Sequence, residues 1–163
     1  GSILRLFEVP SNGGDTLFSS MYAAYDALSE AMKELLGKLS AMHDGGPNYI
    51  DRAKRAGIYD STKVFPANPH PVIRTHPETG RKAIFVNKIF TQYITGIPKD
   101  ESRAILDFLF QHIAKPNFQC RFKWEKDSVA FWDNRCALHH AMWDYYPETR
   151  RGFRVTIKGD KPC

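Results

Sequence analysis

The chain lacks the features that mark several special classes of protein. No apolar run approaches the roughly 20 residues that a membrane-spanning helix needs, so no membrane segment is expected. No basic leader followed by an apolar stretch opens the sequence, and nothing in it suggests secretion. Repeats and low-complexity segments are absent as well. These absences leave a globular protein that does not enter a membrane.

Cysteine is scarce and shows no pairing pattern. The three cysteines, Cys120, Cys136 and Cys163, are odd in number and form no Cys-x-x-Cys pair. Disulfides persist in oxidising compartments, and a protein that depends on them usually shows an even set of cysteines. Free thiols in a reducing compartment are the simplest interpretation, and we therefore expect a cytoplasmic protein.

The bulk composition fits one domain that spans residues 1–163. Of the 163 residues, 42% are hydrophobic and 25% are charged, which is enough apolar material for a substantial core. The net charge of +5 (23 Lys and Arg minus 18 Asp and Glu) favours anionic ligands. Nucleic-acid binding needs basic residues clustered on one face, whereas here they are scattered among acids, so no nucleic-acid partner is expected.

Hydrophobic spacing predicts a mainly β chain with inserted helices. Residues 118–124 alternate strictly between apolar and polar side chains, which is typical of a strand with one buried face. Between Met21 and Met42 apolar residues recur at three- and four-residue steps instead, and Ser29 is placed to cap the second of two short helices. Strands are expected at 3–9, 72–76, 82–86, 118–124, 128–133 and 152–157, and a further helix at 98–115. This pattern favours a β-sandwich or jelly-roll core.

One long segment, residues 44–71, shows no sustained period and is rich in glycine, proline, asparagine and charge. A loop of this length inside a compact domain is usually either a functional lid or a disordered insert. We predict a lid.

The stretch from Asp133 to Arg154 concentrates histidine, aromatic residues and arginine. In an extended strand Phe153 and Val155 lie on one face and Arg154 on the other, and Arg150 shares the face of Arg154 if the strand continues backwards. Two guanidiniums on one side of a strand form a fork-like receptor for carboxylate, sulfonate or phosphate. By pattern alone, the simpler alternative of a solvated arginine face is favoured.

The same stretch carries His139 and His140, which we expect in a loop. Imidazole is a ligand for iron, zinc, copper and nickel, but one ligand does not make a metal site. By composition alone, a structural or exposed role is favoured for both histidines.

Several motifs resemble one known family. WDNRCALHH (132–140) and the tail DYYPETRRGFRVTIKGDKP (144–162) are similar to the C-terminal signature of the taurine dioxygenase family, whose members are iron(II)- and 2-oxoglutarate-dependent dioxygenases. Residues 12–28, which include GGDT, also resemble this family, as do residues 74–90 and 108–135. The motifs occur in the family's order, and the resemblance covers practically the whole chain.

The resemblance implies a double-stranded β-helix, or jelly-roll, in which two histidines and one carboxylate hold the iron. It also implies roles for particular residues, carried over motif by motif. His139 is the distal iron ligand, Arg150 and Thr16 bind 2-oxoglutarate, Arg154 binds the anionic head of the substrate, and Phe90 and Tyr49 line the substrate pocket. His140 is then a neighbour of the ligand, with a structural role.

The other two iron ligands of the family come from a His-x-Asp motif N-terminal to GGDT, and this chain has none there. His76-Pro77-Glu78 is its one His-x-acid sequence, and the resemblance places it in a hairpin turn, while His43-Asp44 matches non-ligand positions. We therefore expect residues 1–163 to correspond to the C-terminal two-thirds of a dioxygenase. The jelly-roll would then be incomplete at its N-terminus, and its open edge would favour homo-oligomers.

For function, the resemblance implies hydroxylation of a small anionic substrate by O2, with 2-oxoglutarate converted to succinate and CO2. A sulfonate such as taurine or an alkyl sulfate is the expected substrate class. Two alternatives remain open at this point: a carboxylated, aryloxyalkanoate-like substrate, and a non-catalytic remnant of the fold that binds anions without iron.

Overall fold

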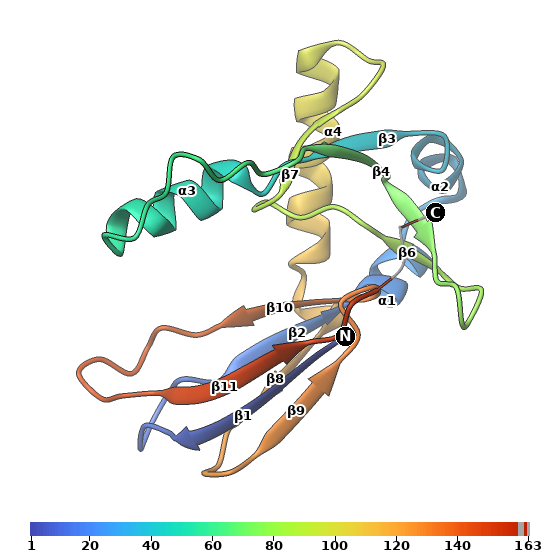
Figure 1. Cartoon of the computed structure of the whole chain (residues 1–163). Coiled ribbons are helices and arrows are strands. Elements are labelled where there is room, and N and C mark those ends of the chain that lie inside the picture. Colours follow the sequence, from blue (N-terminus) through green and yellow to red (C-terminus); the bar gives the residue numbers. More distant parts are fainter. Residues whose placement is uncertain (160–161, 163) are drawn as a thin grey trace.

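Two antiparallel three-stranded sheets face each other in one half of the computed structural model, which describes residues 1–159 and 162 (Figure 1). The first sheet has the order β11–β1–β9 and the second β10–β2–β8. The strands are β1 (Ser2–Glu8), β2 (Thr16–Ser20), β8 (Gln119–Phe122), β9 (Val129–Trp132), β10 (Ala137–Ala141) and β11 (Arg151–Thr156). The rings of Trp132 on β9 and Phe18 on β2 lie 5.3 Å apart, so the inner faces of the two sheets meet.

A layer of helices and short strands packs against one end of the sheets (Figure 1). Its helices are α1 (Met21–Asp26), α2 (Glu30–Leu36), α3 (Gly46–Arg55) and α4 (Lys99–Ile113), followed by the 3-10 turn η1 (Pro116–Phe118). Its strands are β3 (Ser40–His43), β4 (Asn68–Pro71), β5 (Ile73–Thr75), β6 (Lys82–Ile84) and β7 (Thr91–Ile94). Strands β4, β3 and β7 form a sheet, and β5 and β6 form a hairpin. The main buried cluster of apolar residues lies in this helical layer.

Helix α4 forms as its sequence predicts. Asp100 and Glu101 lie in the first turn, where carboxylates interact favourably with the helix dipole. Leu106, Leu109 and Ile113 make the buried stripe and are at most 6% exposed. The predicted mainly β chain with inserted helices is thus confirmed, as is the hairpin of β5 and β6.

The helical region after Met21 is shorter than predicted. Ser29 does cap α2, since its Oγ accepts a hydrogen bond from the Met32 amide at 3.3 Å. The helix ends at Leu36, however, and Ser40–His43 form β3 instead of a further helical turn. Strand β3 lies between β4 and β7 and pairs with both, so long-range backbone pairing overrides the local apolar period.

The prediction that residues 44–71 are a loop is wrong for two parts of the segment, which form α3 and β4. The Asp44 carboxylate accepts a hydrogen bond from the Gly46 amide at 2.7 Å, and Asp51 pairs with Arg55 one turn later. The helix is short and mostly polar, and its few apolar side chains, Tyr49, Ile50 and Ala53, are too few to set a sustained period along residues 44–71. Helix α3 projects from its layer on the same side as the loop between β10 and β11 (Figure 1).

Two strands that carry site residues, β2 and β10, are absent from the sequence-based prediction. Residues 137–141 have no apolar alternation, and the expectation that His139 and His140 lie in a loop is wrong. The pairing of β10 with β2 holds this segment extended. In the described part of the chain, no helix is both long and apolar enough to span a membrane.

Candidate active site

Strand pairing brings Thr16 and His139 to the same face of one sheet. His139 on β10 lies directly opposite Phe18 on β2, and their rings are 6.5 Å apart. Residues opposite each other in an antiparallel pair share a face, and so do residues two apart on one strand. Thr16 therefore lies on the same inner face as His139, two residues before Phe18 on β2.

Arg150, just before β11, reaches across to this face. Its Nε donates to the Gly14 carbonyl oxygen at 2.9 Å, and its Nη2 donates to the Thr16 hydroxyl at 3.2 Å. The Trp124 indole donates to the same hydroxyl at 2.9 Å, and its ring lies 5.4 Å from the Arg150 guanidinium carbon. Thr16 and Trp124 are both buried, so three residues from distant parts of the chain form one polar cluster against an aromatic wall.

The electrostatic state of Arg150 follows from its burial. Desolvation lowers the pKa of its guanidinium, and Tyr145 offsets this only in part. Among residues 1–159 and 162, no carboxylate forms an ion pair with Arg150. A half-buried cation whose partners are a carbonyl oxygen and a hydroxyl is a favourable place for an added carboxylate, which would restore the lost charge stabilisation.

The glycines of GGDT make this contact possible. Gly13 and Gly14 have φ values of +75° and +69°, a region that other residues seldom adopt. A Cβ atom on Gly14 would lie 3.2 Å from Arg150 Cδ and 3.0 Å from Pro10 Cγ. The motif therefore lets its backbone carbonyl approach the arginine side chain closely.

Trp132 links His139 to Arg154. The His139 ring lies 4.9 Å from the Trp132 ring, and the Arg154 guanidinium carbon lies 5.4 Å from the same ring. Arg154 Nη2 also donates to the Ser2 hydroxyl at 3.0 Å. Partial burial lowers the pKa of His139, and the neighbouring Arg154 and His140 lower it further. Both side chains keep solvent access, so this end of the site is open.

The inner face of β11 is the arginine face. Phe153 and Val155 on the opposite face are 70% and 59% exposed, whereas Arg154 contacts Trp132. Arg154 is itself exposed, so this face is solvated, and it also contacts Trp132 and Ser2. Its role as an anion receptor stays a prediction.

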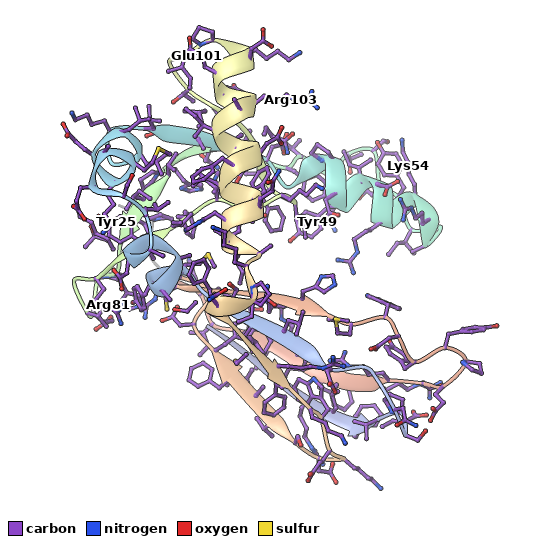
Figure 2. The ribbon with its side chains drawn as sticks, turned by 180° about the vertical axis from the view of Figure 1, so that it is seen from behind. Tyr25, Tyr49, Lys54, Arg81, Glu101 and Arg103 are labelled. Atoms are coloured by element: carbon purple, nitrogen blue, oxygen red, sulfur yellow. The ribbon has the colours of Figure 1, made fainter. Side chains whose placement is uncertain are left out.

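The two predicted pocket-wall residues lie together in the helical layer. The rings of Tyr49 on α3 and Phe90, just before β7, are 6.1 Å apart, and Tyr49 stacks on Phe65 at 5.5 Å. Figure 2 shows Tyr49 at the end of α3 nearest α4, with Lys54 near the opposite end. Within the described residues, no ring contact or hydrogen bond connects this aromatic pair to His139 or Arg154.

The residues present fit the two predicted ligands unequally. Arg150 and Thr16 are suited to a carboxylate of 2-oxoglutarate. In the described part of the chain, the one group of three His, Cys, Asp or Glu side chains close enough to share a metal is His76, Asp133 and Cys136, which does not include His139. The described residues therefore do not complete a three-ligand iron site around His139.

Sequence reasoning missed Trp124, Trp132 and Gly14 as parts of the site. The alternation in residues 118–124 predicts the strand that leads to Trp124 but not the hydrogen bond from its indole to Thr16. Trp132 immediately precedes the Asp-Asn-Arg motif, and this position is the sequence feature that could have identified it as part of the site.

Comparisons with known proteins identify the family of this chain. The sequence profile of the "Taurine catabolism dioxygenase TauD, TfdA family" matches residues 1–156, and the chain belongs to this family. It is similar to a solved taurine dioxygenase from Burkholderia xenovorans, with a TM-score of 0.86 and 36% identity over 99% of this chain and 54% of that one.

Two yeast proteins are similar in sequence. A Schizosaccharomyces pombe protein, named provisionally as an alpha-ketoglutarate-dependent sulfonate dioxygenase, is 43% identical over 99% of this chain and 41% of its own length. The Saccharomyces cerevisiae alpha-ketoglutarate-dependent sulfonate dioxygenase is 34% identical over 99% of this chain and 39% of its own length. The chain thus spans about two-fifths of the length of these two relatives.

Proposed function

We propose that this chain provides the cosubstrate- and substrate-binding residues of an iron(II)- and 2-oxoglutarate-dependent dioxygenase. The overall reaction uses O2 to hydroxylate a small anionic substrate and converts 2-oxoglutarate to succinate and CO2. The observation that carries the proposal is the Arg150 cluster, in which a half-buried guanidinium and the Thr16 hydroxyl face the interior without a carboxylate among the described residues. Family membership supports the same interpretation.

The cosubstrate would span the distance between Arg150 and His139. Its far carboxylate would bind Arg150 and Thr16, since a guanidinium fixes a carboxylate by paired hydrogen bonds. Thr16 and His139 share one face, so the other end of the molecule would point towards His139. Neutral imidazole is the form that binds metal, and the lowered pKa of His139 favours it. We assign His139 as one iron ligand and the two facing sheets as part of a double-stranded β-helix.

Arg154 would bind the anionic head of the substrate beside Trp132 and close to His139. A sulfonate or sulfate ester is the proposed class, which the sulfonate dioxygenases among the relatives support. The same guanidinium would accept a carboxylated aryloxy compound, which is the alternative substrate class. Tyr49 and Phe90 would cover the apolar part of the substrate if α3 acts as a lid.

The proposal is tested by titrating 2-oxoglutarate into the protein anaerobically, with and without iron(II), by isothermal calorimetry. Arg150→Ala should weaken binding by roughly 2–4 kcal/mol, because a charge-assisted pair is lost in a half-buried site. Arg151→Ala is the matched control, since Arg151 is exposed and pairs with Glu8. Equal effects of the two substitutions, or no binding to the unmodified chain, would contradict the proposed cosubstrate site.

A second candidate, an anion-binding protein without catalysis, is favoured by one observation: the described residues do not complete an iron site around His139. Succinate formation separates the two candidates. The protein is supplied with iron(II), ascorbate, O2 and 2-oxoglutarate, and then with taurine, an alkyl sulfate or an aryloxyacetate. Succinate that depends on one of these compounds supports the dioxygenase. Binding of 2-oxoglutarate without any turnover supports the second candidate.

A further inference from the structure

A buried histidine outside the proposed site contacts the turn that leads into the strand of His139. His76 follows β5 and is 4% exposed. Its Nδ1 accepts hydrogen bonds from the Glu78 and Thr79 amides at 3.2 and 3.3 Å. A ring nitrogen that accepts from amides carries no proton, so in the neutral ring the proton is on Nε2.

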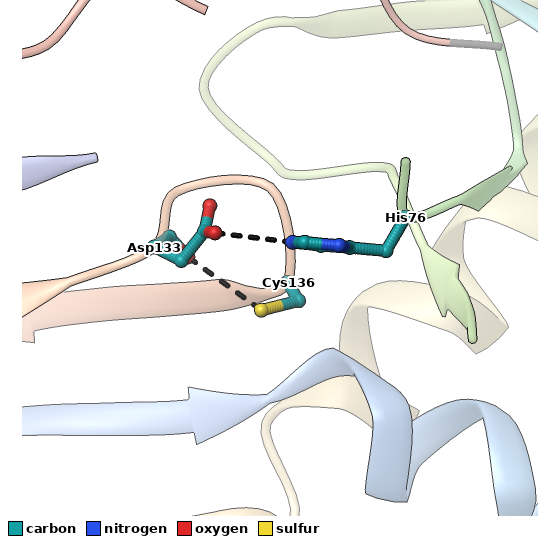
Figure 3. A group of neighbouring side chains, drawn as sticks. All are labelled: His76, Asp133 and Cys136. Atoms are coloured by element: carbon teal, nitrogen blue, oxygen red, sulfur yellow. Dashed lines mark hydrogen bonds and ion pairs between the residues drawn. The ribbon is translucent and has the colours of Figure 1, made fainter. Parts of the chain in front are cut away.

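That proton is directed at Asp133. His76 Nε2 lies 3.1 Å from Asp133 Oδ2 and donates to it (Figure 3). The same carboxylate accepts from the Arg135 amide at 2.8 Å and from the Arg135 guanidinium at 2.8 to 3.0 Å. The Arg135 side chain is the main cause that holds the pKa of Asp133 far below its usual range, so Asp133 is ionised and the hydrogen bond from His76 is charge-assisted.

Asp133 in turn sets the start of β10. Its carbonyl oxygen accepts from the Cys136 and Ala137 amides at 3.3 and 3.0 Å, which closes the turn. The Cys136 carbonyl oxygen then accepts from the Met21 amide at 2.9 Å. Ala137 begins β10, and His139 lies two residues further on the same strand. A tilt or shift of this turn would therefore change where the His139 ring lies.

The grouping of His76, Asp133 and Cys136 also resembles a set of metal ligands, since their ligand atoms lie within 4.8 Å of one another. Their protonation and hydrogen bonds argue against a cation. His76 Nε2 holds a proton, both Asp133 oxygens accept from Arg135, and burial raises the pKa of the Cys136 thiol. The arrangement is a hydrogen-bonded connection between the β5–β6 hairpin and the turn before β10.

We infer that His76 is a positioning residue for His139, acting through the Asp133 carboxylate and the turn before β10. This inference rests on the proposed function, because the position of the His139 ring affects activity only if His139 is an iron ligand. Partners outside the immediate ligand shell commonly change metal affinity by about 10–100-fold when they are removed. His76 would be such a partner, although it is 63 positions before His139 in the sequence.

Two substitutions separate the two hydrogen-bonding roles of His76. His76→Asn keeps an acceptor near the Nδ1 position, so the hairpin turn is preserved while the donor to Asp133 is lost. His76→Gln keeps a donor near the Nε2 position. The matched control is His112→Asn. His112 is also 4% exposed, and its Nε2 donates to the Ala24 carbonyl oxygen at 2.8 Å instead of to a residue of the turn before β10.

The position of His139 can be read without catalysis. Its ring lies beside Trp132, so its proton NMR signals carry a ring-current shift that changes when the ring moves. His139→Ala identifies these signals among the six histidines of the chain.

We expect His76→Asn to shift the His139 ring signals. His76→Gln should restore most of the original signal positions, and His112→Asn should lower stability without moving the His139 signals. Unchanged His139 signals in a folded His76→Asn protein would overturn the inference, and so would equal changes in the His112 control. If His76→Asn does not fold, a His76→Gln protein with displaced His139 signals overturns it. Loss of 2-oxoglutarate binding in the unmodified protein would instead count against the proposed function.

Discussion

The helical layer and the pair of facing sheets use their interiors differently. In the helical layer Leu36, Leu109 and Ile94 are at most 1% exposed and belong to one apolar cluster. Between the sheets the interior holds Thr16, Arg150 and aromatic rings, and an open cavity of about 300 Å³ adjoins Phe18 and Trp132. One region is stabilised by packing of apolar side chains, whereas the other places polar and cationic side chains beside aromatic rings.

The outer face of the first sheet carries apolar side chains that are not buried, unlike those of the helical layer. Phe131, Phe153 and Val155 are 66%, 70% and 59% exposed, although apolar side chains gain most from burial. In the helical layer Ser102 Oγ accepts a hydrogen bond from the Ile94 amide at 2.7 Å, whereas Nε and Nη2 of the buried Arg74 find no hydrogen-bond partner among the described residues. Most of the apolar burial lies in the helical layer, and Thr16, Arg150 and His139 of the proposed site lie on or beside the sheets. Substitutions in the two regions should consequently change different measured quantities.

The largest expected effect is on the packing of the helical layer. Leu109→Ala should lower the free energy of unfolding by about 2–5 kcal/mol, because it leaves a cavity in a fully buried position. Leu35→Ala removes the same atoms from a residue that is 46% exposed, and its effect should stay within about half a kcal/mol. Urea unfolding measures both. Similar losses would show that the apolar cluster is not the main source of stability.

The anion site should respond without a comparable loss of stability. Arg154→Ala should weaken binding of the sulfonate or sulfate substrate by about 1–2 kcal/mol, a modest figure because the side chain is exposed. Binding of 2-oxoglutarate at Arg150 should be unchanged. Arg5→Ala is the control, since Arg5 pairs with Asp127 on the same sheet. Competition NMR with taurine measures the affinity, and a matching loss in the control would count against a specific site.

Acid should weaken the helical layer through His43. Burial lowers the pKa of His43 to about 4, and the neighbouring His70 adds to this. A histidine with a depressed folded pKa contributes stability that is present above about pH 6.5, its unfolded value, and that is lost as the pH falls towards about 4.

Because His43 is half-buried, we expect a loss of only about 1–2 kcal/mol between pH 7 and pH 4 from this residue. His43→Gln should remove that part of the pH dependence, as measured by urea unfolding across the range. If the variant and the unmodified protein lose stability in parallel, His43 is not the cause.

The smallest expected effect concerns a helix end. Ser29→Ala removes the side-chain acceptor for the Met32 amide and should cost about 0.5–1 kcal/mol of unfolding free energy. Ser61→Ala, at an exposed turn position, should be nearly neutral. Thermal unfolding of the two variants side by side provides the measurement. A larger loss of stability at Ser61 than at Ser29 would contradict the assignment of Ser29 as the cap of α2.

The sequence by itself determined the elements whose signals are local. Helix α4 has its acidic first turn and apolar stripe in consecutive residues, and the hairpin of β5 and β6 follows from two short apolar runs around a turn. The ordered motifs also identified the family, because GGDT and the Asp-Asn-Arg turn carry that information without a structure. Helix α3 was missed because its apolar face is limited to Tyr49, Ile50 and Ala53 within a polar segment rich in glycine and proline.

Only the tertiary structure decided which residues meet and which faces are buried. Thr16 and Arg150 are 134 residues apart in sequence, and their hydrogen bond depends on how β2, β11 and the glycine turn are placed. The alternation around Arg154 defines two faces of a strand but does not say which one is inside. Pairing of β1 with β9 and β11 makes that choice, as pairing of β10 with β2 does for His139. Strand register is a long-range property, since it depends on the partner strand as much as on the strand itself.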